Sequence, residues 1–147
     1  MTLKIKNTNT ISVMLLTLAV VLASCKNDDP APSKRPFLVG KTWIVVQYAL
    51  NGEDQTEDRD ECEFDNTTAF FNDGTYREDI GDIACEESEN NVEGTWSFKA
   101  NETIISFRPA NENASDWKIE ELSDDFLKIS QYVPTVKAEV LIVMAPL

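Results

Sequence analysis

Beyond residue 36, short runs of apolar and β-branched residues alternate with short polar stretches. In the clearest run, Val92–Phe98, every second residue is apolar or glycine, so these residues share one face of a strand. Asn51-Gly52 and Asn72-Asp73-Gly74 separate neighbouring runs, and both are typical of tight turns. No segment repeats apolar residues at helical spacing over ten or more residues. The pattern therefore predicts an all-β domain.

Eight segments have the composition of strands. They are Thr42–Leu50, Glu63–Phe71, Thr75–Asp79, Val92–Phe98, Thr103–Phe107, Trp117–Leu122, Phe126–Val133 and Lys137–Ala145. Because most connections are short, we expect sequential antiparallel order. Lys137–Ala145 is the most continuously apolar segment, which indicates a last strand that pairs with the first and leaves no edge exposed. The prediction is an eight-stranded antiparallel up-and-down barrel, and the alternative is a two-sheet β-sandwich.

The start of the chain has the pattern of a secretion signal. Lys4 and Lys6 precede the apolar segment Ile11–Ala23, which is too short to span a bilayer as a helix. Leu22-Ala23-Ser24-Cys25 resembles the lipobox of bacterial lipoproteins, in which the signal is cleaved before an acylated cysteine. We therefore expect a signal peptide over residues 1–24 and a membrane anchor of acyl chains such as palmitate on Cys25. The alternative is an ordinary signal peptide followed by a chance cysteine.

Residues 25–36 are expected to form the lipidated cysteine and an extended tether. Three prolines between Pro30 and Pro36 disfavour a helix and favour an extended chain. Lys26-Asn27-Asp28-Asp29 resembles the surface-export signals of some Gram-negative lipoproteins. We therefore expect an outer-membrane lipoprotein exposed at the cell surface, with a periplasm-facing position as the alternative. The folded domain is expected to occupy residues 37–147.

The net charge of the chain restricts the classes of molecule that it can bind. The 147 residues include 13 basic and 26 acidic ones, for a net charge of −13. Loss of residues 1–24 removes Lys4 and Lys6 only, which leaves 11 basic and 26 acidic residues and a net charge of −15. Nucleic acids are bound by clustered Lys and Arg, which this chain lacks, so they are not expected partners. The remaining candidate partners are a small apolar ligand and an envelope protein. The membrane is a further expected partner, bound through the acyl chains on Cys25.

The residue composition also restricts which catalytic groups and metal sites the chain can form. The chain has no histidine, which removes the commonest zinc ligand and the histidine-based catalytic triads. A pair of carboxylates, as in glycosidases, remains possible, but no pair stands out in the sequence. The acidic stretch Glu53–Glu61 lacks the acid and glycine spacing of a calcium-binding EF-hand loop. We therefore expect no catalysis, no cofactor and no metal site.

With Cys25 lipidated, two cysteines remain in the domain. Cys62 and Cys85 are expected to form a disulfide, as paired cysteines in exported domains usually do. The tight turn at Asn72–Gly74 joins the second and third strands, which places the far ends of these strands side by side. The alternative is a pair of reduced, buried thiols.

Several stretches read together resemble a known family. They are Leu38–Trp43 (LVGKTW), Asn72–Tyr76 (NDGTY), Glu93–Phe98 (EGTWSF) and the hairpin Trp117–Ile129. Their order resembles that of the lipocalin-like domain lipoproteins of Gram-negative bacteria, over nearly all of residues 37–147. The resemblance implies a barrel that binds a small hydrophobic or amphipathic molecule at its mouth. An eight-stranded barrel can hold one small ligand or be filled by its own side chains.

The resemblance also implies a role for one tryptophan. Lipocalins have a Gly-x-Trp motif whose tryptophan packs across the closed end of the barrel. Here the spacing is Gly40-Lys41-Thr42-Trp43, one residue longer, and Trp43 is the implied structural plug. A basic residue usually packs on that tryptophan, and Arg108 is the candidate.

Six aromatic residues on the predicted strands are candidates for lining a binding cavity. They are Tyr48, Phe70, Tyr76, Trp96, Phe98 and Phe107. The alternative is that these side chains fill the core, as aromatic residues on strands commonly do. In that case the protein would act as an accessory or interaction protein of the envelope through its acidic surface loops.

Overall fold

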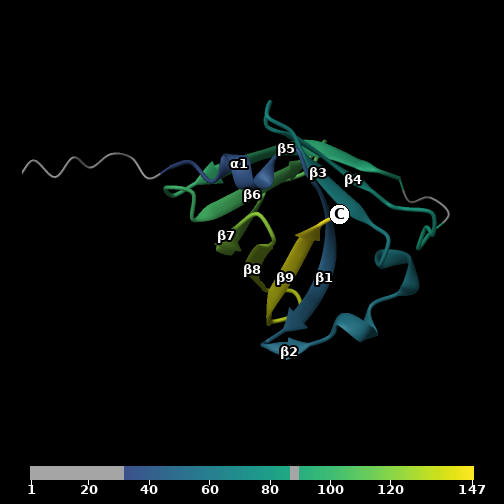
Figure 1. Ribbon diagram of the computed structural model, residues 1–147. Helices are drawn as coiled ribbons and strands as arrows, with labels where there is room; N and C mark the ends of the chain where they lie inside the picture. Colours follow the sequence, from purple (N-terminus) through teal and green to yellow (C-terminus); the bar gives the residue numbers. More distant parts are fainter. Residues whose placement is uncertain (1–31, 87–89) are drawn as a thin grey trace, which may run out of the picture. The chain divides into compact units, whose positions relative to one another are not determined.

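The computed structural model describes residues 32–86 and 90–147, which contain nine strands and three short helical turns (Figure 1). The strands are β1 (Thr42–Leu50), β2 (Glu53–Asp54), β3 (Thr67–Phe70), β4 (Thr75–Asp79), β5 (Val92–Lys99), β6 (Ile104–Pro109), β7 (Ser115–Leu122), β8 (Leu127–Val133) and β9 (Ala138–Pro146). The turns are α1 (Arg35–Leu38), η1 (Thr56–Asp58) and η2 (Glu61–Glu63). The predicted signal peptide and Cys25 lie outside the described residues.

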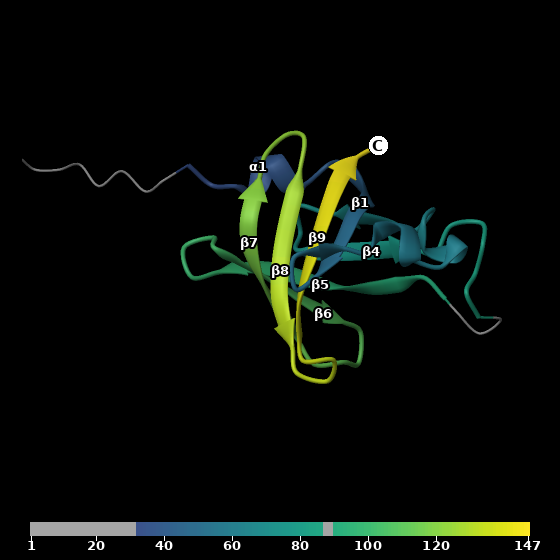
Figure 2. The ribbon, with the colours of Figure 1, turned by 90° about the horizontal axis from the view of Figure 1, so that it is seen from below.

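Eight of these strands form a closed antiparallel barrel. Each strand from β3 to β8 pairs with the next one in the sequence, and β1 pairs with both β3 and β9. Figure 2 shows β7, β8, β9 and β1 side by side in one wall. The closure confirms the predicted eight-stranded up-and-down barrel and excludes the two-sheet sandwich. It also explains the apolar sequence of β9, which has a neighbour along each edge.

Strand boundaries follow the sequence pattern closely, except around the second predicted strand. β1 and β4 begin and end at the predicted residues. The strand expected over Glu63–Phe71 begins only at Thr67, because residues 61–63 form the turn η2, in which the Glu63 amide donates to the Asp60 carbonyl. The prediction was wrong there because hydrogen bonds within a loop compete with strand pairing.

The segment before β1 folds onto one end of the barrel. We expected an extended chain up to Pro36, but Arg35–Leu38 form a helical turn, because proline is compatible with the first turn of a helix. Lys34 Nζ donates to the Glu102 carbonyl, Arg35 Nη1 to the Asn72 carbonyl, and Lys41 Nζ to Asp124 Oδ1. These three acceptors lie in or beside three different hairpin turns. The segment therefore ties the turns together and closes this end, the left side in Figure 1.

The core lies next to this closed end. Its buried members are Leu38, Trp43, Phe70, Tyr76, Trp96, Ile105, Ile119, Leu127, Ile129 and Met144. Leu38 and Trp43 have no exposed surface, and Trp43 Nε1 donates to the Leu38 carbonyl over 3.0 Å. Lys41 Nζ, and not Arg108, lies over the Trp43 ring, 5.6 Å from its centroid. Arg108 is exposed on β6, so the sequence analysis named the wrong residue as the cation that packs on Trp43.

A disulfide joins Cys62 and Cys85 at the opposite, loop-rich end of the barrel, with their Cα atoms 5.2 Å apart. This confirms the predicted pairing and excludes two reduced thiols. Closing a loop of this length contributes about 3 kcal/mol in the chain-entropy view. Residues 32–147 form one compact unit with its own core and this cross-link. Within the described residues, no helix combines the length and the apolar composition needed to cross a membrane.

Candidate functional site

A cavity of about 870 Å³ lies in the mouth of the barrel and is open to solvent among the loops opposite α1. Pockets for small ligands are typically about 300–1,000 Å³, so the space suits one small molecule. Loops that follow β2, β4 and β6 contribute polar residues to its mouth, and strand residues from around the barrel line its interior. The position follows from the topology, because strands of an up-and-down barrel direct alternate side chains inward.

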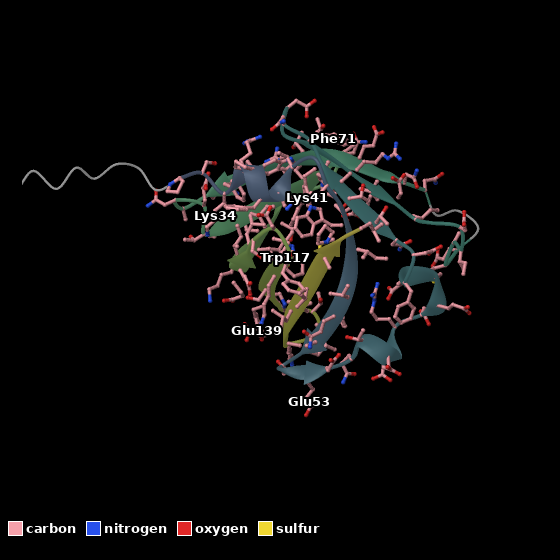
Figure 3. All side chains as sticks on the ribbon, viewed as in Figure 1. Lys34, Lys41, Glu53, Phe71, Trp117 and Glu139 are labelled. Atoms are coloured by element: carbon pink, nitrogen blue, oxygen red, sulfur yellow. A yellow bond between two sulfur atoms is a disulfide. The ribbon has the colours of Figure 1, made fainter. Side chains whose placement is uncertain are left out.

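The interior wall is mostly apolar. It is formed by Val45, Leu50, Phe70, Tyr76, Val92, Phe107, Trp117, Ile129, Ile142 and Met144. Trp117 reaches this wall from β7 (Figure 3). The Tyr76 and Phe107 rings pack edge to face with their centroids 5.7 Å apart, and the Phe70 ring lies 5.9 Å from Phe107. Apolar and aromatic surface of this kind binds hydrocarbon by removing it from water.

Four of the six candidate aromatic residues line this cavity. Tyr48, Phe70, Tyr76 and Phe107 all contribute to its wall. Trp96 and Phe98 do not belong to the lining residues, although both lie on β5. They pack against each other with their ring centroids 5.2 Å apart, in the part of β5 that approaches α1.

The surroundings of Trp96 explain its position. The Arg35 guanidinium lies 4.5 Å from the Trp96 ring centroid, and Trp96 Nε1 donates to the Phe71 carbonyl over 3.2 Å. These contacts hold the ring in the closed end, where α1 and a hairpin turn cover it. Sequence alternation placed Trp96 on the inward face of β5, but it could not tell the closed end from the open one.

The sequence analysis missed several lining residues, of which Trp117 and Glu78 are the most informative. Trp117 was assigned to a predicted strand without a role. Glu78 lies two residues after Tyr76 on β4, so strand alternation places both on one face. The signal for Glu78 was therefore present in the sequence, but a charged residue is not normally expected on the inner face of a barrel.

The mouth of the cavity carries six acidic residues and one basic residue among those described. The acidic residues are Asp58, Asp60, Glu63, Glu78, Asp79 and Glu112, and the basic residue is Arg59. Arg59 Nε lies 3.3 Å from Glu63 Oε2, and Arg59 Nη2 donates to the Glu63 carbonyl. Asp79 pairs with Arg77, which points away from the cavity. The mouth therefore keeps a strong negative charge.

Glu78 and Tyr76 have perturbed acidities. Desolvation by the cavity wall raises the pKa of the Glu78 carboxyl above its ordinary value, although this side chain remains accessible to solvent. Desolvation raises the pKa of Tyr76 to about 12, and the charges of Glu78 and Glu112 act in the same direction. Two carboxylates therefore lie close enough to this phenol to influence its ionisation, and the phenol stays protonated at physiological pH.

The loops at the mouth are held in place by local bonds. The Tyr48 amide donates to Thr56 Oγ1 over 2.9 Å, and the Gln55 amide donates to the Tyr48 carbonyl over 2.8 Å. The Asp82 amide donates to Asp65 Oδ2 over 2.7 Å, beside the disulfide that joins these two loops. These bonds fix the mouth to the barrel wall. In the described part of the chain, no group of three acidic or cysteine side chains is arranged to hold a metal ion.

One solved structure agrees with this architecture, and a second was found at lower structural similarity. A solved DUF4847 family protein from Bacteroides vulgatus ATCC 8482 superposes with a TM-score of 0.54 at 14% identity, over 77% of this chain and 96% of that one. A lipocalin-like protein from Bacteroides uniformis ATCC 8492 gives a TM-score of 0.48 at 17% identity, over 76% of this chain and 99% of that one. No curated protein sequence gave a significant match.

A family model described as a lipocalin-like domain matches residues 38–129. This segment is more than half of the chain, and it runs from the last residue of α1 to the middle of β8. It includes three stretches noted in the sequence: LVGKTW at the closed end, NDGTY at a hairpin turn and EGTWSF in the wall of the barrel. The chain belongs to the lipocalin-like domain family.

Proposed function

We propose that this protein binds a small hydrophobic or amphipathic molecule inside its barrel, without catalysing a reaction. The observation that carries the proposal is the cavity of about 870 Å³ with an aromatic and aliphatic wall. A barrel filled by its own side chains would leave no such space, so the cavity favours a binding role over an accessory protein that acts only through its surface loops. The complete absence of histidine supports a non-catalytic role.

Native mass spectrometry of the domain purified gently from its host tests this proposal. We expect extra mass that is reproducible and is lost on denaturation. Thr68→Trp places a large side chain on the cavity wall and is expected to abolish the extra mass. Thr95→Trp makes the same change at an exposed position and should retain it. A bare mass for the unaltered domain from several growth conditions would contradict the binding role.

We further propose that the domain is anchored in the outer membrane through acyl chains on Cys25 and is displayed at the cell surface. The support is the sequence alone: the charged start, the apolar segment and the four-residue box occur in the order that lipoproteins require. Two or more acyl chains give stable anchoring, whereas one gives marginal binding. The alternative orientation faces the periplasm, and protease treatment of intact cells distinguishes the two.

Cys25→Ser is expected to abolish incorporation of labelled palmitate and to move the protein from the membrane fraction to the soluble fraction. Ser24→Ala keeps a small residue before the cysteine and should leave both properties unchanged. Labelling and fractionation of the two variants side by side provide the measurement. If the Cys25→Ser protein remained labelled and membrane-bound, the lipoprotein assignment would be wrong.

A further inference from the structure

The cavity wall contains an unusual charged position at Glu78. On β4 it pairs with Thr68 of β3 and with Val92 of β5, and all three side chains line the cavity. The neighbouring charged residues Arg77 and Asp79 pair with each other, with Arg77 Nη2 2.6 Å from Asp79 Oδ2. Glu78 has no ion pair or side-chain hydrogen bond with any residue that the structure describes. It is therefore an unneutralised carboxylate that faces the space a ligand would occupy.

Glu112 adds a second carboxylate at the same place. Glu112 lines the same cavity as Glu78 and Tyr76, and the charges of both carboxylates act on the Tyr76 phenol. Phe107 packs edge to face with Tyr76, so aromatic rings lie next to these carboxylates. Carboxylates combined with aromatic rings are a favourable environment for an organic cation, because both attract positive charge.

Arg59, the one basic residue among the described lining residues, does not offset this charge. Arg59 is bound to Glu63 through Nε and Nη2, and its guanidinium lies 5.1 Å from the Phe64 ring centroid. Its remaining nitrogen, Nη1, is buried without a hydrogen-bond partner and has no surface that a molecule in the cavity could reach. The contacts of Arg59 are therefore made within its own loop, and its guanidinium is not available to bind an anionic group.

We propose that the bound molecule is an amphiphile with a cationic head group, whose hydrocarbon part occupies the cavity and whose charge lies beside Glu78 and Glu112. This inference rests on the proposed binding function and adds the chemical class of the ligand. The charge of Glu78 has no partner and lies beside the aromatic pair of Tyr76 and Phe107, and a bound cation would neutralise it. An anionic amphiphile, such as a fatty-acid carboxylate, would instead meet like charges at the mouth.

Three probes with the same alkyl chain test the inference: decyltrimethylammonium, decanol and decanoate. They are titrated into residues 32–147 below their micelle concentrations, and binding is followed by calorimetry and by tryptophan fluorescence, since Trp117 lines the cavity. We expect decyltrimethylammonium to bind at least roughly tenfold more tightly than decanoate, with decanol between them. Equal affinities, or tighter binding of decanoate, would overturn the cationic class while leaving the binding function intact.

Substitution locates the charge effect. Glu78→Gln keeps the shape of the side chain and is expected to weaken decyltrimethylammonium roughly tenfold while leaving decanol unchanged. Glu93→Gln removes the same charge from the exposed face of the neighbouring strand β5, and should change neither affinity more than about twofold, because an exposed charge is screened. Glu112→Gln provides a second variant with the same expected direction as Glu78→Gln.

The outcomes separate the two proposals. If decyltrimethylammonium bound equally to the unaltered domain and to the Glu78→Gln and Glu112→Gln variants, the head-group position would be wrong. If only decanol bound, the cavity would accept alkyl chains without selecting a cation, and the inference would fail alone. If none of the three probes bound, the proposed binding function would fail together with the inference.

Discussion

Replacing Trp43 with alanine is expected to lower the free energy of unfolding by about 4 kcal/mol, as full truncation of a buried tryptophan usually does. Trp43 has no exposed surface and lies in the core at the closed end of the barrel. The substitution also leaves the Leu38 carbonyl without its donor, Trp43 Nε1. Folded domains are stable by only about 5–15 kcal/mol, so this loss is a large part of the total. Urea unfolding followed by circular dichroism measures it.

Two other variants separate the contributions. Trp43→Phe keeps an aromatic ring and removes the hydrogen bond to Leu38, so we expect a smaller loss of roughly 1–2 kcal/mol. Trp117→Ala truncates a tryptophan that is only partly buried and already borders a cavity, so it should cost roughly 2 kcal/mol. Similar losses for Trp43→Ala and Trp117→Ala would show that Trp43 has no special role in closing the barrel.

Gly94→Ala is expected to lower the free energy of unfolding by about 2–3 kcal/mol, because the new methyl group has no room. A Cβ atom at this position would lie 2.3 Å from the Arg108 carbonyl oxygen and 2.6 Å from Tyr76 Cε1. The first contact is with backbone of the paired strand β6, which cannot move without disturbing the sheet. The second would displace the Tyr76 ring from the cavity wall, so ligand affinity should fall together with stability.

Gly52→Ala is the matched control for this effect. No atom lies within 4 Å of a Cβ at Gly52, and its only cost is the positive φ of +83° in the turn between β1 and β2. We expect a loss of about 1 kcal/mol and unchanged ligand affinity. Denaturant unfolding and probe titration of both variants provide the measurement. If Gly94→Ala were no more harmful than Gly52→Ala, the close packing of β5 against β6 would not limit this position.

The strands could be predicted because their signals are local. Alternation of apolar and polar residues identified β5, and the turn residues Asn51-Gly52 and Asn72–Gly74 set the ends of β1, β3 and β4. The start of β3 could not be predicted, because the residues before Thr67 are held by a turn, a disulfide and contacts between two loops. The helical turn α1 was missed for a related reason, since the segment that contains it, from Lys34 to Lys41, is held by contacts with three hairpin turns that lie far away in the sequence.

The candidate site was predictable only in part. Large aromatic residues on strands were correctly placed inside the barrel, since their burial follows from residue type and alternation. Their position along the barrel axis was not predictable, so Trp96 and Phe98 could not be distinguished from Tyr76 and Phe107. Glu78 was also unassigned, because the absence of a partner for its charge is a property of the surrounding strands and loops.

The sequence by itself determined the all-β class, the number and order of the barrel strands, the pairing of Cys62 with Cys85 and the negative charge of the domain. The strands depend on residue type and on spacing over a few positions, whereas the disulfide and the charge depend on composition: two cysteines in the domain and an excess of acidic residues. Only the tertiary structure decided which end of the barrel is closed, that the other end holds an open cavity, and that Glu78 faces this space unpaired. The physical reason is that a cavity and its electrostatics arise from side chains brought together from different strands, whose combined packing no single segment encodes.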